Sequence, residues 1–410
     1  MRKILVHWQG IIYSLLGLKL LSMLILPTWS DFLYGWTFEV STIVPTLVSG
    51  KLPTLSTYGV YIGIEMILAP FYWIWTLLPI DHPTVANLVQ YTAPAVSLGF
   101  LMKIPILLFD SASLILLIRI VRRITNSEET SIIAGLTWFA NPYNFYMLYF
   151  WGAMDIIPIA VFLLAILFEL EGKWFRCGIS TMCTGLLRLF AFAVYPFFSP
   201  LTRTKSVIGK FVIGSTVPVA IAIGLIYLSH DTLATVFNIP AQQFWLLEFL
   251  GFNIWGMQFV RLSPVLVLFQ LYVVLRFWRQ GTNIVYLATV SLLALLLGAT
   301  LYGGEAQHFL WVCPLLSACI AMHLEDWWIY TLTSFTALLS PTVNPFTHWT
   351  PEPYLLDTFL AGAFYAMKAI YLLSLNLSNF RIPLQLQHPA PFGQYSSPQR
   401  LITHQPVSTG

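Results

Sequence analysis

The chain has 410 residues, of which 58% are hydrophobic and 9% charged, and its mean hydropathy is +0.76. This composition excludes an ordinary soluble domain, and a net charge of +3 is too small to indicate a nucleic-acid partner. Apolar runs recur at lengths near the ~20 residues that a helix needs to cross a bilayer. We therefore expect an all-α integral membrane domain over residues 1–377 and a Pro-rich, disordered cytoplasmic tail over 378–410.

The expected architecture is a polytopic transmembrane helix bundle of about twelve spans plus a re-entrant hairpin. The predicted spans are 8–28, 59–79, 84–101, 103–121, 131–150, 154–171, 211–229, 262–278, 283–301, 309–323, 327–342 and 358–377. Basic clusters at 119–123, 173–176, 203–210 and 276–279 are expected to be cytoplasmic. The short segment 84–101 is counted as a crossing because the cluster at 119–123 would otherwise lie outside. The hairpin is predicted at 177–200, an apolar stretch with basic residues on both sides.

The polar stretch after the first span carries Asp31 next to aromatic residues, and it is expected to lie outside the membrane. A carboxylate at this surface can act as a general base where a lipid head group enters. The alternative is a solvated loop Asp beside an interfacial aromatic belt. Glu39 shares the face of Asp31 if the stretch forms a short surface helix.

Two charged residues, Lys103 and Asp110, are predicted to lie in one span. Their separation of seven residues places them on one helical face, about 10 Å apart along the axis. Lys19 in the first span is expected to pair with Asp110 or with Glu65. An ion pair that fixes the helix register and a functional site are both open for this group.

Further charged residues are expected at other points of the external side. Asp155 follows Gly152, which permits a tight turn and would present the acid at an external mouth. Arg188, in the predicted re-entrant segment, suits bidentate binding of a phosphate, although an arginine can also extend to the interface. Arg261 is a second phosphate candidate that can equally anchor a helix end.

The last polar group lies in the segment from Glu305 through Gln307 to His308. Glu305 and His308 are three residues apart, so one helical turn would direct both toward one site. As a metal-binding pair this is a weak signal, because no other residue nearby has ligand spacing.

Four blocks of the chain resemble the C-superfamily glycosyltransferases, and the similarity is strongest to prokaryotic relatives of the catalytic subunit of GPI mannosyltransferase I. The blocks are the loop 31–58 with its acid, Lys-Ile-Pro at 103–105 with Asp110, Asn-Pro at 141–142 with Trp-Gly-Ala-Met-Asp at 151–155, and Gln-His-Phe-Leu-Trp at 307–311. Ala153 stands where the family pattern has Gln. Ala306 and His308 replace its Pro and Tyr.

The resemblance implies a multi-pass enzyme in a prokaryotic plasma membrane, or in the endoplasmic reticulum of a eukaryote. Such an enzyme transfers a hexose, with mannose the expected sugar, from a polyprenyl-phosphate donor to a lipid, glycan or protein acceptor. Asp31 would be the general base. The donor-binding candidates are Arg188, Arg261, Lys103, Asp110, Asp155, Glu305, Gln307 and His308. A divalent cation, Mg²⁺ or Mn²⁺, is left open as a cofactor. The alternatives are a transporter or flippase, and a non-catalytic membrane scaffold.

Overall fold

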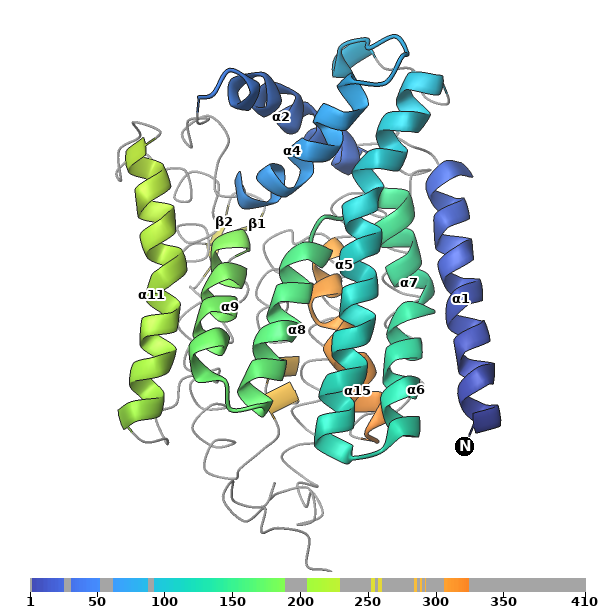
Figure 1. The fold of residues 1–410 in the computed structure, drawn as a ribbon, viewed down its shortest axis with the longest axis vertical. Helices are drawn as coiled ribbons and strands as arrows, with labels where there is room; N and C mark the ends of the chain where they lie inside the picture. The colour runs from blue at the N-terminus through green and yellow to red at the C-terminus, as the bar shows by residue number, and fades with distance from the viewer. Residues whose placement is uncertain are drawn as a thin grey trace, which may run out of the picture.

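The structure is a computed structural model that describes residues 2–25, 31–51, 62–87, 92–188, 205–228, 252–254, 257–259, 284–285, 288–289, 292 and 306–323. This part of the chain is helical apart from one short strand pair, as the all-α prediction requires (Figure 1). The predictions for the spans 262–278, 327–342 and 358–377, the tail, Arg261 and Glu305 lie outside the described residues.

The longer helices run alongside a common axis (Figure 1). They are α1 (Arg2–Ile25), α5 (Ala93–Thr125), α6 (Glu128–Phe139), α8 (Ile156–Leu170), α9 (Trp174–Leu187) and α11 (Lys205–Leu228). Within the described residues, α5 and residues 205–225 of α11 are long and apolar enough to cross a membrane, with mean hydropathies of 2.2 and 1.8. Association with a membrane is thereby supported, and the count of about twelve spans stays a prediction.

Helix α5 is one continuous helix of 33 residues, so the prediction of separate spans at 84–101 and 103–121 is wrong. Pro94 stands in the first turn, where its missing N–H costs nothing. Pro105 lies inside the helix, where neighbouring helices of a bundle can compensate for the lost hydrogen bond. The helix ends at Asn126, whose left-handed backbone (φ 53°) lets its N–H bond to the carbonyl of Arg122.

Two helices, α2 (Asp31–Val48) and α4 (Ile62–Thr76), lie at the end of the bundle opposite the N-terminus (Figure 1). We call this the α2 end, and the other the N-terminal end. Because α1 runs toward the α2 end and α5 returns from it, the chain between them makes no net crossing. Helix α4 lies across the α2 end instead of running along the axis that the longer helices share (Figure 1). The prediction of a crossing at 59–79 is therefore wrong. A crossing at 84–101 is then no longer needed to bring the basic cluster at 119–123 to the N-terminal end.

The predicted span 131–150 is broken into three pieces: α6, α7 (Pro142–Phe145) and the π-helix η2 (Tyr146–Trp151). Asn141 stands between the end of α6 and the start of α7, and its side chain caps α7. Its side-chain oxygen accepts hydrogen bonds from the backbone N–H groups of Tyr143 at 2.8 Å and Asn144 at 3.2 Å. Gly152, with φ 80°, ends η2 in a conformation that favours glycine.

The turns that join α5 to α6 and α8 to α9 both lie at the N-terminal end (Figure 1). The basic clusters at 119–123 and 173–176 adjoin these turns, so they gather at the end where the chain begins. This is the arrangement that the positive-inside pattern predicts. Helix α9 forms the first arm of the predicted re-entrant hairpin, and residues 189–200 lie outside the described part of the chain.

Short elements complete the described structure. Strands β1 (Phe252–Ile254) and β2 (Met257–Phe259) pair antiparallel. The remaining pieces are the 3₁₀ turn η1 (Val85–Asn87), the 3₁₀ helix η3 (Ala306–Trp311) and the buried helix α15 (Cys313–Ala321), which packs on α6.

Candidate functional site

Two residues that the sequence placed in separate blocks, Asp155 and Arg188, meet in an ion pair. The Nε atom of Arg188 lies 2.6 Å from Oδ1 of Asp155. Asp155 directly precedes α8, and Arg188 follows α9 with an extended backbone (φ −157°, ψ 129°), so the short α8–α9 hairpin brings the two together. Neither was predicted to be the partner of the other.

Asp155 was predicted to stand at an external mouth; it lies at the start of α8, but it is not exposed there. Its side chain is fully buried, as is the turn of residues 151–154 before it. The physical reason is the broken helix α6–α7–η2, whose end at Gly152 lies within the bundle. A buried carboxylate needs a counter-ion, and Arg188 supplies it.

The α2 end of the bundle covers this ion pair. The guanidinium carbon of Arg188 lies 5.8 Å from the centre of the Trp36 ring, within the range of a cation–π contact. A Cβ atom on Gly63, at the start of α4, would lie 2.7 Å from the Leu187 side chain, so α4 approaches the end of α9 closely. Asp31 is the first residue of α2, five residues or about 7.5 Å along the axis from Trp36. Its side chain is not among the described ones.

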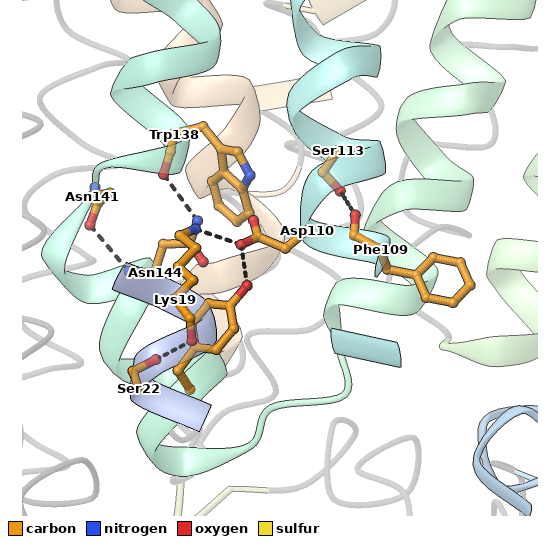
Figure 2. A network of polar contacts seen from close by, with 9 residues as sticks. Lys19, Ser22, Phe109, Asp110, Ser113, Trp138, Asn141 and Asn144 are labelled. Atoms are coloured by element: carbon orange, nitrogen blue, oxygen red, sulfur yellow. Dashed lines mark hydrogen bonds and ion pairs between the residues drawn. The ribbon is translucent and has the colours of Figure 1, made fainter. Parts of the chain in front are cut away.

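A second buried ion pair joins α1 to α5 (Figure 2). Nζ of Lys19 lies 2.5 Å from Oδ2 of Asp110, and the Tyr149 hydroxyl donates to the same oxygen at 2.8 Å. The ammonium also lies 3.5 Å from the centre of the Phe139 ring. The predicted pair of Lys19 with Asp110 is confirmed, whereas its alternative, Lys19 with Glu65, is not formed. This group fixes α1 against the bundle.

Lys103 shares the inner face of α5 with Asp110, as the spacing predicted, and is fully buried. Its ammonium has no hydrogen-bond or ion-pair partner among the described residues. It is the only buried cation in this part of the chain without a carboxylate beside it.

Two glutamates meet where α2 packs on α4. The Glu65 side chain is buried, and burial, followed by the influence of the nearby Glu39 carboxylate, raises the pKa of Glu65 to about 9. Glu65 is therefore protonated at neutral pH and can donate to Glu39. The sequence offered Glu65 only as a partner for Lys19, because nothing in it showed that α2 is a helix lying across α4.

The third and fourth blocks of the resemblance lie against each other. The rings of Tyr143 and Phe309 are 5.3 Å apart, and the Asn141 amide lies 3.8 Å from the sulfur of Cys313. This contact brings η3, which contains Gln307 and His308, to the break between α6 and α7. The side chains of those two residues are not among the described ones.

The residues that the structure describes include no group of three or more His, Cys, Asp or Glu side chains able to hold a metal. Both buried aspartates already have a cationic partner. The side chains of Asp31, Glu305 and His308 are not among the described ones, so the divalent cation stays open.

These features define an all-α protein with at least two helices suited to a membrane and buried ion pairs between its helices. No protein-family model, curated protein or solved structure matches the chain.

Proposed function

We propose that the protein is a membrane glycosyltransferase that moves a hexose, with mannose the expected sugar, from a polyprenyl-phosphate donor to a lipid, glycan or protein acceptor. The observation that carries the proposal is the meeting of Arg188, Asp155 and Trp36 beneath α2. It joins a cation suited to phosphate, the acid of the third block of the resemblance and the helix that begins with Asp31. The contact between Tyr143 and Phe309 adds the fourth block to the same bundle.

The arrangement suits the chemistry of sugar transfer. Transfer with inversion needs a base to deprotonate the acceptor hydroxyl, and Asp31 at the start of α2 is the candidate. It also needs positive charge at the departing phosphate, for which Arg188 is the candidate. Asp155 and the Trp36 ring orient the guanidinium, whose planar fork can bind two phosphate oxygens.

The same structure gives less support to a transporter or flippase. That reading needs buried charges that form a path, for which Lys19, Glu65, Lys103 and Asp110 are the candidates. Lys19 and Asp110 are instead held by Tyr149 and Phe139 in one closed group. Such a group acts as an anchor between helices more readily than as a step in a path.

The experiment is a transfer assay with purified protein in nanodiscs, using radiolabelled dolichyl- or undecaprenyl-phosphate mannose. Asp31→Asn should reduce transfer by about 10²–10⁴-fold while donor binding is kept, because asparagine cannot take the proton of the acceptor. Asp81→Asn, which removes an exposed carboxylate between α4 and α5, is the control and should retain activity.

Two outcomes would contradict the proposal. Full transfer by the Asp31→Asn protein would remove Asp31 as the base. Movement of the intact labelled donor across the bilayer, without release of sugar by the wild-type protein, would favour the flippase instead.

A further inference from the structure

Three cationic side chains are buried among the described residues, and they differ in one respect. Lys19 is paired with Asp110, and Arg188 is paired with Asp155. Lys103, at 0% exposure, has no partner in this part of the chain. An isolated charge in an apolar interior is strongly unfavourable, so a partner that is not part of the described protein is expected.

The position of Lys103 on α5 determines what can reach it. The buried residues Gly99, Lys103, Ile106 and Asp110 recur at intervals of three and four, so they form the inner face of the helix. Asp110 lies about 10 Å farther along the axis and is held by Lys19 and Tyr149. It cannot neutralise Lys103 without releasing them.

The other direction along this face leads to the α2 end. Gly99, one turn closer to the α2 end, has no side chain on the same inner face. Lys103 is the eleventh residue of α5, about 15 Å from the start of the helix. An anionic group that reached the ammonium along this face from the α2 end would pass Gly99.

We propose that Lys103 is a phosphate-binding residue inside the bundle and that it takes the phosphate of a lipid. A lysine ammonium is a compact charge with three donors, which suits a phosphate without further protein ligands. A lipid brings its phosphate from an apolar surrounding without first dissolving in water. This inference deepens the proposed function and rests on it for the lipid: the phosphate is that of the polyprenyl donor, and Lys103 would be a second cation for it beside Arg188.

The proposal predicts an unusual combination for Lys103→Met. Methionine has a similar length and no charge, so it removes a buried ammonium that has no protein counter-ion. The variant should unfold at the same temperature as the wild type or higher, yet bind the lipid phosphate about tenfold to a hundredfold more weakly. Lys19→Met should do the reverse for stability, because it leaves Asp110 buried without its partner.

The test uses full-length protein in nanodiscs of zwitterionic lipid. A short-chain polyprenyl phosphate is the probe, the corresponding polyprenol is the phosphate-free control, and inorganic phosphate is the third arm. Lys103→Arg, which keeps the charge, should retain most of the binding. Lys173→Met removes a half-exposed lysine at the N-terminal end and should change neither quantity.

Selective loss of polyprenyl phosphate binding in a stable Lys103→Met protein supports the proposal. If inorganic phosphate binds Lys103 of the wild-type protein as well as polyprenyl phosphate does, a lipid is not the source of the phosphate. Unchanged polyprenyl phosphate binding overturns the site, and so does a Lys103→Met protein that is destabilised as strongly as Lys19→Met, because Lys103 would then have a structural partner. Binding is measured without sugar transfer, so the site and the proposed function can fail separately.

Discussion

Buried charge in this bundle is handled by pairing residues from different helices. Lys19 of α1 neutralises Asp110 of α5, and the Tyr149 hydroxyl adds a hydrogen bond to the same oxygen. An ion pair of this kind adds little net stability, but the loss of one partner is costly because the other charge remains buried. The pair therefore fixes where α1 docks.

This cost can be measured with Asp110→Asn, which leaves the Lys19 ammonium without a counter-ion. The free energy of unfolding should fall by about 3–5 kcal/mol, the usual result of breaking a buried pair. Adding Lys19→Met should recover much of the loss, since no isolated charge then remains. Unfolding in detergent measures both variants, and a double variant as unstable as the sum of the two single ones would contradict this explanation.

The sequence predicted one ion pair and missed the other, for a physical reason. Charges in apolar spans must find partners, which limited Lys19 to Asp110 or Glu65. Arg188 and Asp155 had no such limit, because both stand where helices end. The positions of those ends depend on Asn141, Gly152 and the α8–α9 turn, whose arrangement in space local sequence does not determine.

At the scale of the elements, glycine determines how closely α9 and α11 approach. A Cβ atom on Gly178 would clash with the carbonyl oxygen of Phe211, and one on Gly214 would clash with that of Phe175. Backbone atoms cannot move aside as a flexible side chain can. These two glycines therefore permit a contact between helix backbones, as small residues do in membrane bundles.

Gly178→Ala should consequently lower the free energy of unfolding by about 1–3 kcal/mol, the usual cost of overpacking. Gly209→Ala in α11 is the matched control. A Cβ there meets nothing within 4 Å, and alanine favours the helix by up to about 1 kcal/mol. Thermal unfolding of the two variants should shift in opposite directions. Equal shifts would mean that α9 and α11 do not depend on this contact.

The pairing of α2 with α4 should depend on pH through Glu65. Its pKa is raised from an ordinary value of 4.5 to about 9, so between these values the folded state holds a proton that the unfolded chain has released. The stability that this proton provides is complete below pH 4.5, decreases above it and is lost by about pH 9. Glu65→Gln cannot ionise and should remove this contribution. The unfolding temperatures of both proteins at pH 6 and pH 9.5 test this, and parallel decreases would contradict it.

For the whole molecule, the sequence predicted the all-α class but misjudged the crossings before α5. Hydropathy counts apolar segments and does not distinguish a helix that crosses from one that lies across an end, such as α4. The predicted boundary between the segments 84–101 and 103–121 likewise does not exist, because α5 passes through it. Tertiary packing makes this possible, because neighbouring helices support what an isolated segment would not.

The corrected path through the bundle makes a definite prediction about sidedness. Lys51, just after α2, and Glu129, after the α5–α6 turn, are both exposed and belong to opposite ends. The basic clusters at 119–123 and 173–176 predict that the N-terminal end faces the cytoplasm. In intact cells an impermeant maleimide should label Lys51→Cys, and should label Glu129→Cys only after permeabilisation. Replacing the four native cysteines with alanine removes the background. The reverse pattern would mean that the bundle is inverted. The Arg188–Asp155 pair would then lie near the wrong leaflet for a donor outside the cell. Equal labelling of both sites in intact cells would mean that α5 does not cross.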